Sequence, residues 1–304
     1  MLFKDWQADG TTYAKDPCVV YFKGCAWLYY SAHGLKEIGI AVSDDYENWT
    51  IKGYIKPETE AEGHMICAPA AIVINDVLHL FYQSYGNFPR DYICHAWSED
   101  GIVFHRDPTN PIIRPSGEWN AGRAIDADVI AFEDKLYCYW ASRDPSCEIQ
   151  LLGVSTAPLD SGFHAQDWTQ QCTGPILQPE LPWEQACIEA PAALVHQGKV
   201  YMFYAGAYNC CPQQINCAVS DDGIHFTRIC DQPLQGPGQE GSWNASESGH
   251  PYVWQAEEGK IHLFYQGSPD QGKNWMISRV EVLKLSPEQV VLSDMLQEEW
   301  RNIT

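Results

Sequence analysis

Short runs of aromatic and aliphatic residues recur along the chain, whereas apolar positions spaced for an amphipathic helix are nearly absent. Five of these runs have an aromatic ending, and each follows an apolar stretch that opens a repeated unit. The five runs are Trp27-Leu28-Tyr29-Tyr30, Leu80-Phe81-Tyr82, Tyr137-Cys138-Tyr139-Trp140, Val200-Tyr201-Met202-Phe203-Tyr204 and Leu263-Phe264-Tyr265. The units begin near residues 16, 68, 126, 189 and 250, a period of roughly 60 that indicates an internal repeat.

Each unit continues with a third strand that carries small residues, a turn rich in Asp and Gly, and a short fourth strand. We expect the fourth strands to end in Trp49, Phe104, Trp168 and Phe226. Asp-Gly between two apolar runs is a strong hairpin signal. Four antiparallel strands in each of five units predict an all-β fold, a five-bladed β-propeller. A β-sandwich is the alternative, but it gives no reason for so even a period.

The two ends of the chain are expected to complete this fold. The N-terminal arm, residues 1–14, and the strand Met276–Val282 should meet and close the ring. Ser286-Pro287-Glu288-Gln289 resembles a helix-capping box with proline at the first helical position. It predicts a short C-terminal helix over residues 287–301, and we expect residues 1–304 to form a single domain.

Charge and cysteine content limit the partners and the compartment. The net charge of -21 argues against nucleic acid, because phosphate binding needs a basic stripe and the sequence has none. No apolar run reaches membrane-spanning length, and the first residues do not resemble a signal peptide. The 12 cysteines fall largely inside strand-like runs, which is typical of buried thiols in a reducing cytoplasm. Only the vicinal pair Cys210-Cys211 stands apart, and its role stays open.

Carboxylates open three of the five units, where the inner strand of a propeller blade lines the central channel. Asp16 and Asp126 share one repeat position, which is Ala68 in the second unit, and Glu189 lies one residue earlier, beside Ala190. Three acidic groups in one funnel cannot all ionise cheaply, so one should stay protonated. A protonated carboxyl beside an ionised one is what glycoside hydrolysis requires. The alternative is that each Asp only caps a turn.

These residues also carry a family resemblance that extends over nearly the whole chain. The segments Lys15-Asp16-Pro17, Cys67-Ala68-Pro69, Ile125-Asp126-Ala127-Asp128-Val129, Ile188-Glu189-Ala190-Pro191 and Gly249-His250 resemble glycoside hydrolase family 43. The resemblance implies an inverting glycosidase in which Asp16 is the general base, Glu189 the general acid and Asp126 the carboxylate that raises the pKa of the acid. It also implies that His250 lies near the channel floor, where the family often holds a water or a calcium ion.

Further polar residues near these segments are candidates for substrate binding. Asp128 should share a strand face with Asp126, and Arg123 could hold a sugar hydroxyl or pair with a carboxylate. The remaining candidates, in loops before the blades, are His64, Trp119 and Glu247. Most tryptophans are expected to pack between blades, and a solvated loop charge is the alternative for Glu247.

The resemblance therefore implies an α-L-arabinofuranosidase or β-xylosidase. Because the first residues do not resemble a signal peptide, we expect it to be exo-acting on short oligosaccharides in the cytoplasm, where polymers are not met. No organic cofactor is required, a calcium ion in the central channel is an option, and the oligomeric state stays open. One alternative is a retaining fructan- or sucrose-cleaving enzyme. Arg143-Asp144-Pro145 resembles a motif of that group, but we discount it because it follows the second strand of its blade. The chain could instead be a phosphorolytic enzyme or a non-catalytic sugar-binding propeller.

Overall fold

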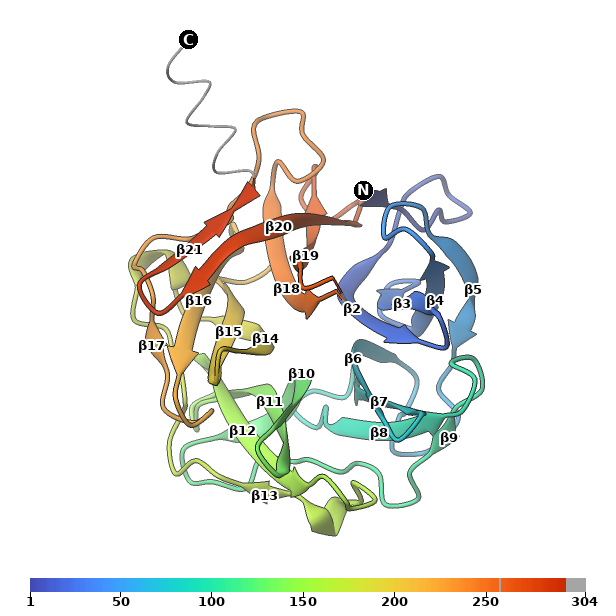
Figure 1. Ribbon diagram of the computed structural model, residues 1–304, viewed down its shortest axis with the longest axis vertical. Helices are drawn as coiled ribbons and strands as arrows, with labels where there is room; N and C mark the ends of the chain where they lie inside the picture. The colour runs from blue at the N-terminus through green and yellow to red at the C-terminus, as the bar shows by residue number, and fades with distance from the viewer. Residues whose placement is uncertain (257, 294–304) are drawn as a thin grey trace.

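The computed structural model describes residues 1–256 and 258–293 and has five antiparallel sheets arranged around a central axis (Figure 1). The first sheet consists of β2 (Lys15–Phe22), β3 (Cys25–Ala32), β4 (Glu37–Ser43) and β5 (Thr50–Ile55). The second consists of β6 (Ile66–Ile74), β7 (Val77–Ser84), β8 (Ile93–Ser98) and β9 (His105–Arg106). The third consists of β10 (Ala121–Phe132), β11 (Lys135–Arg143), β12 (Gln150–Pro158) and β13 (Thr169–Gln170).

The fourth sheet consists of β14 (Ile188–His196), β15 (Lys199–Gly206), β16 (Gln214–Ser220) and β17 (Thr227–Arg228). The fifth consists of β18 (Glu247–Gln255), β19 (Ile261–Ser268) and β20 (Met276–Ser286), joined by β1 (Leu2–Phe3) and β21 (Gln289–Leu292). Two 3-10 turns, η1 (Ala165–Asp167) and η2 (Pro182–Glu184), lie in connections. The predicted five-bladed propeller is confirmed, and we number the blades I to V in this order.

The first strand of each blade lies nearest the axis, and neighbouring inner strands contact one another around the ring (Figure 1). Five clusters of buried apolar side chains fill the spaces between the blades, one cluster at each interface. The aromatic repeat residue on the second strand of each blade is also buried, as Tyr30 and Trp140 illustrate with no exposed surface. A single blade could not bury both of its faces, so the ring as a whole forms the core.

The Asp-Gly turns of blades II and IV also contact the preceding blade, where the hydroxyls of Tyr29 and Tyr139 donate to the backbone carbonyls of Gly101 at 3.0 Å and Gly223 at 2.9 Å. Asp100 accepts the backbone N–H groups of Ile102 and Val103, both at 2.8 Å, and so closes the turn in blade II. Gly101 adopts a φ of +79°, and a Cβ there would lie 2.7 Å from the Trp27 ring of blade I. The residue is glycine for both reasons, since other side chains rarely adopt this conformation and none would fit.

The ends of the chain meet in blade V, as expected. Leu2 and Phe3 of β1 pair with Ser278 and Ile277 of β20, which closes the ring. The predicted C-terminal helix is not found over residues 287–292, because residues 287 and 288 form a turn and β21 returns along β20. The remainder of the predicted helix lies outside the described residues.

The fourth strands differ from the prediction in one respect. They begin directly after Trp49, Phe104, Trp168 and Phe226 instead of ending there. These aromatic side chains pack in or against the apolar clusters between the blades. This packing explains why an aromatic residue recurs before the fourth strand of four units. The twelve cysteines are all unpaired, and no helix in the described part of the chain is long and apolar enough to cross a bilayer.

Candidate active site

The five inner strands share one backbone irregularity near the axis. Each has a register shift against its second strand, and the residue at the shift has a positive φ between 41° and 52°. The residues with this conformation are Asp16, Ala68, Asp126, Ala190 and His250. Left-handed backbone is strained for residues other than glycine, and such strain concentrates at functional sites. The fold therefore presents the same position of every blade to the axis.

Glu189 occupies the neighbouring repeat position, directly before the left-handed Ala190. The predicted one-residue offset between Glu189 and the two aspartates is thus confirmed. The corresponding residues of the other blades are Lys15, Cys67, Ile125 and Gly249. Three of the left-handed residues, Asp16, Asp126 and His250, line one cavity together with four residues of this neighbouring position, namely Lys15, Cys67, Ile125 and Glu189.

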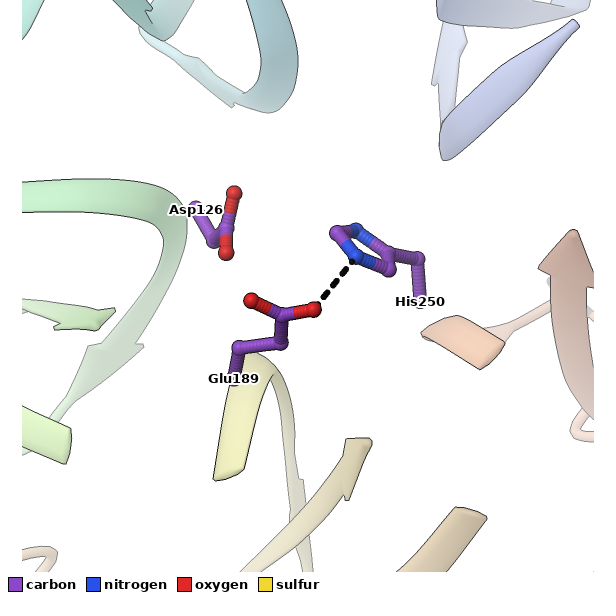
Figure 2. Close-up of side chains that lie close together, drawn as sticks. All are labelled: Asp126, Glu189 and His250. Atoms are coloured by element: carbon purple, nitrogen blue, oxygen red, sulfur yellow. Dashed lines mark hydrogen bonds and ion pairs between the residues drawn. The ribbon is translucent and has the colours of Figure 1, made fainter. Parts of the chain in front are cut away.

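That cavity, which we call the axial cavity, has a volume of about 250 Å³. It brings the three predicted carboxylates together with His250 and the cations Lys15, Arg123 and Arg143. Its other lining residues are Leu35, Cys67, Gln83, Tyr85, Ile125, Tyr208 and Asn209. Figure 2 shows Asp126, Glu189 and His250 directed toward one another from three different blades, and one ligand atom from each lies within 4.8 Å of the others.

His250 links the two outer carboxylates. Its Nδ1 lies 2.7 Å from Asp16 Oδ1, and its Nε2 lies 3.2 Å from Glu189 Oε1 (Figure 2). Burial lowers the pKa of His250, but the two carboxylates outweigh it and raise that pKa well above the ordinary value. The imidazole is therefore a buried cation held between two anions.

Asp16 is the ionised carboxylate of the site. Burial raises its pKa, but the charge and hydrogen bond of His250, with smaller contributions from Lys15 and Ser31, lower it to about 2. The Ser31 hydroxyl donates to Asp16 Oδ2 and accepts from the backbone N–H of Ala68 at 2.8 Å. Asp16 is thus fixed in position and remains negatively charged at neutral pH.

Asp126 and Glu189 divide the remaining charge. Burial, aided by the charges of Glu189 and Asp16 and opposed by His250, raises the pKa of Asp126 to about 7. Burial also raises the pKa of Glu189, but the hydrogen bonds and charge of His250 outweigh it and lower that pKa. The raised pKa expected for Glu189 is therefore not found in the substrate-free site. The proton of this coupled pair resides on Asp126, whose Oδ2 has no hydrogen-bond partner among the described residues.

Glutamines that the sequence did not single out hold these carboxylates. Gln213 Nε2 donates to Glu189 Oε1 at 2.7 Å, and Gln150 Nε2 donates to Glu189 Oε2. The backbone N–H of Asp126 donates to Gln83 Oε1 at 2.5 Å, and the backbone N–H of Asp16 donates to Gln266 Oε1 at 3.1 Å.

The repeat explains where these amides come from. Gln83 and Gln266 extend from the second strands of blades II and V, opposite the residue that precedes the left-handed position. Blades III and IV have Ala141 and Ala205 at that second-strand position. Gln150 at the start of β12 and Gln213 just before β16 hold Glu189 instead. A Cβ on Gly249 would lie 1.8 Å from Gln213 Oε1, so the small residue in blade V makes room for this amide.

The other predicted binding residues separate into two groups. Arg123 lines the axial cavity and donates through Nη2 to Gln150 Oε1 at 2.9 Å. Asp128 lies outside that cavity along a narrower axial channel, where its Oδ2 accepts the backbone N–H of Ala193 at 2.6 Å. Glu247 is fully buried behind the site, which contradicts both the sugar contact and the solvated charge. It accepts hydrogen bonds from Gln266 Nε2 at 2.7 Å and from the backbone N–H of Cys210 at 2.5 Å.

His64 and Trp119 do not line the axial cavity. His64 is exposed in a turn before β6. Trp119 stacks on Trp140 with ring centroids 5.9 Å apart and packs against the clusters on either side of blade III. Both predictions of subsite residues fail because a position upstream of a blade does not determine whether a loop turns toward the axis.

Arg143 lies at the end of the second strand of its blade, as expected, and its side chain nevertheless reaches the site. It ends β11 and lines the axial cavity, whereas Asp144 accepts backbone N–H groups within its own turn, including that of Glu148 at 2.8 Å. Lys15 is a further lining cation that the sequence did not suggest. The sequence signal that could have identified Arg143 was its place on the second strand, because that strand pairs with the inner strand that lines the axis.

The calcium ion stays a prediction, and the donor set fits it poorly. Both ring nitrogens of His250 face carboxylates, so the imidazole has no free lone pair for a metal. Calcium takes six to eight oxygen ligands, and the Asp126, Glu189 and His250 group supplies two carboxylates. Because a protonated imidazole already provides positive charge here, we derive no chemical step through a metal.

Comparison with known proteins agrees with the fold and identifies the family. A thermostable family-43 glycoside hydrolase shares 20% sequence identity with a TM-score of 0.75, and the match covers 92% of both chains. An endo-1,4-beta-xylanase from Bacteroides thetaiotaomicron VPI-5482 shares 18% identity with a TM-score of 0.73, covering 92% of this chain and 94% of the other.

An alpha-L-arabinofuranosidase from Lactobacillus brevis shares 16% identity with a TM-score of 0.64, covering 88% of this chain and 90% of the other. No curated protein matches the sequence significantly. The family model of glycosyl hydrolases family 43 matches residues 10–285. Since this match covers well over half of the chain, the protein belongs to glycosyl hydrolases family 43.

Proposed function

We propose that this glycoside hydrolase removes terminal α-L-arabinofuranosyl or β-xylosyl residues from short oligosaccharides with inversion of configuration. Family membership establishes hydrolysis of glycosidic bonds, and inversion is general to that family. The sugar, the exo mode of action and the residue roles are our proposal. The observation that carries it is the bridge from Asp16 through His250 to Glu189.

The bridge supports a separation that suits inversion. The two ring nitrogens of His250 flank one ring carbon and direct their N–H bonds away from each other. The imidazole and two contacts of 2.7 and 3.2 Å therefore separate the carboxylate oxygens. Inverting glycosidases hold their carboxyl groups about 6.5–9.5 Å apart so that water fits between them, whereas retaining enzymes hold them about 5–5.5 Å apart. The arrangement therefore favours inversion over the retaining alternative.

Each carboxyl group has a role that matches its protonation state. Asp16, with its lowered pKa, accepts a proton from the attacking water. Glu189 donates a proton to the leaving glycosidic oxygen, while Asp126 holds that proton in the substrate-free site and shares it with Glu189. As substrate displaces solvent, the proton shared by Asp126 and Glu189 passes through Glu189 to the leaving oxygen. Gln150 and Gln213 keep the Glu189 carboxyl in place.

The size of the cavity supports action on chain ends. At about 250 Å³ the axial cavity is smaller than typical ligand pockets of about 300–1,000 Å³, and it suits one terminal sugar better than the middle of a polymer. Free thiols at all twelve cysteines support a reducing compartment. We therefore propose that the enzyme meets its oligosaccharides in the cytoplasm.

The test is a panel of nitrophenyl glycosides assayed with the parent protein and two variants. Glu189→Gln and Asp16→Asn should each reduce kcat about 100- to 10,000-fold, the usual contribution of general acid or base catalysis. The exposed Glu148 provides a matched control, and Glu148→Gln should retain full activity. Sugar binding without turnover by the parent protein would instead support a non-catalytic propeller.

A further inference from the structure

Three cations of the axial cavity lack carboxylate partners. Lys15, Arg123 and Arg143 all line it, yet none forms an ion pair with a described carboxylate within 4.0 Å. Elsewhere the buried or half-buried arginines are paired with glutamate. The pairs are Arg106 with Glu62 at 2.7 Å, Arg228 with Glu184 at 2.9 Å, and Arg279 with Glu47 at 2.5 Å. The missing partners are thus a property of this cavity.

Neutral groups hold the three cations instead. Arg123 Nη2 donates to the Gln150 side chain at 2.9 Å, and Arg143 Nη1 donates to the Tyr208 hydroxyl. Lys15 Nζ donates to the side chain of Asn209 at 3.1 Å. Each cation also lies over an aromatic ring, at 5.8 Å from Phe88 for Arg123, 5.1 Å from Tyr208 for Arg143 and 4.2 Å from Trp275 for Lys15. These contacts orient the side chains without neutralising them.

The two guanidinium groups retain unused donors. The Nε atoms of Arg123 and Arg143 are buried and have no hydrogen-bond partner among the described residues. Burying a charged hydrogen-bond donor without an acceptor has a large free-energy cost. No carboxylate of the site hydrogen-bonds to either Nε atom, although the charge of Arg123 helps to lower the pKa of Glu189.

The charge balance of the cavity is opposite to that of the whole protein. The chain carries a net charge of -21, but the axial cavity is lined by two arginines, a lysine and a histidine against three carboxyl groups. In a protein with so many carboxylates, most cations are expected to have a carboxylate partner. An excess of cations in one cavity therefore indicates that a ligand supplies the negative charge.

We propose that the axial cavity selects a sugar that bears an anionic substituent, a carboxylate or a phosphate ester, and that Arg123 and Arg143 bind that substituent. Ala121, two residues before Arg123 on β10, pairs with Arg143 on β11, so the two arginines lie on adjacent strands at one side of the cavity. Planar guanidinium groups match the oxygens of carboxylate and phosphate in a bidentate manner. This inference deepens the proposed glycosidase function, because it keeps the reaction and refines the terminal sugar from a neutral pentose to a related sugar that carries the anionic group. It rests on the proposed function for the reaction, but not for binding.

Matched ligands isolate the effect of the charge. D-Glucuronate differs from D-xylose by the carboxylate on C5, and D-glucose 6-phosphate differs from D-glucose by the phosphate, so calorimetry with these four sugars separates the two anionic groups. We expect at least one anionic sugar to bind about tenfold or more tightly than its neutral counterpart. The preference should shrink as sodium chloride is raised, because salt screens partly exposed charges.

Variants assign the preference to the arginines. Arg143→Gln removes one charge while leaving the Arg123–Gln150–Glu189 contacts in place, and it should abolish most of the preference for the anion. Arg143→Lys keeps the charge and should restore part of it. Arg114 is exposed, so Arg114→Gln, which removes one charge elsewhere, should bind like the parent protein.

Two outcomes would overturn the proposal. One is equal binding of anionic and neutral sugars, and the other is an anion preference that persists in both Arg143→Gln and Arg123→Gln. Turnover of p-nitrophenyl β-xyloside and β-glucuronide separates this inference from the proposed function. Efficient cleavage of the xyloside with rejection of the glucuronide, and equal binding of D-glucose 6-phosphate and D-glucose, would contradict this inference but not the proposed function. Anion-selective binding without cleavage of any glycoside would sink the catalytic proposal alone.

Discussion

The replacement Asp126→Asn tests how the site stores its proton. Asp126 is 6% exposed, and burial, with the charges of Glu189 and Asp16, raises its pKa to about 7 against the opposing effect of His250. Asparagine has nearly the same shape but cannot hold the proton. The Asp126–Glu189 pair would then depend on Glu189 alone, whose pKa is lowered from its ordinary value of 4.5.

The size of the effect follows from these two pKa values. In the parent protein the pair keeps its proton up to about pH 7, and Asp16 stays ionised above about pH 2, so kcat/KM should be flat between these limits and fall above pH 7. In Asp126→Asn the fall should begin below pH 4.5. At pH 7 the protonated fraction of the acid, and with it kcat/KM, should be more than about 100-fold lower than in the parent protein.

The assay is the pH dependence of kcat/KM on the best substrate of the glycoside panel. Activity of Asp126→Asn should recover at low pH, which a purely structural defect would not produce. Asp128→Asn provides the matched control, because Asp128 is another buried aspartate of β10 that lies outside the axial cavity. An unchanged alkaline limb in Asp126→Asn, or a loss of equal size at every pH, would refute the reasoning.

Three further changes test neighbouring parts of the account. Asp16→Ala should lose most activity, and added azide should restore turnover by forming a glycosyl azide of inverted configuration; no rescue, or an azide of retained configuration, would argue against a general base. Gly249→Ala places a Cβ 1.8 Å from Gln213 Oε1 and should lower kcat about tenfold, whereas Gly174→Ala, where nothing lies within 4 Å, should not. Burial raises the pKa of Asp128 to about 7, above its unfolded value, so its carboxyl destabilises the fold as pH rises from 4 to 7. Urea unfolding of Asp128→Asn should show a gain of up to about 4 kcal/mol at pH 8 and none near pH 4; equal gains at both would contradict the buried acid.

The blade pattern and the carboxylate positions could be predicted because both repeat with the strands. A strand alternates its faces with a period of two, so aligning the aromatic runs also aligns the residues at the axis. The one-residue offset of Glu189 relative to Asp16 and Asp126 was visible in this alignment. Pseudo-symmetry then made three distant residues neighbours.

The C-terminal helix could not be excluded in the same way. Ser286-Pro287-Glu288-Gln289 matches a local helix signal, but Val290 and Leu292 bury their side chains against blade V, in a cluster that also contains Leu285. Packing against a ring that only the complete fold provides outweighed the local preference.

The polar residues around the catalytic groups were hidden for a different reason. Gln150 and Gln213 follow no repeat, since their partner Glu189 is itself unique to blade IV. Arg143 reaches the axis from the end of a second strand, a position that the sequence motif alone assigned to a loop. Such contacts depend on three-dimensional distances between blades, which a single sequence does not contain.

The anomeric configuration of the first-formed product tests the central claim most directly. NMR during early turnover, before mutarotation equilibrates the sugar, distinguishes the two anomers. If water enters between Asp16 and Glu189 across the His250 bridge, the released sugar has the configuration opposite to that of the substrate. Release of the anomer with the configuration of the substrate would mean that Asp16 attacks the sugar itself, and the proposed separation of base and acid would be wrong.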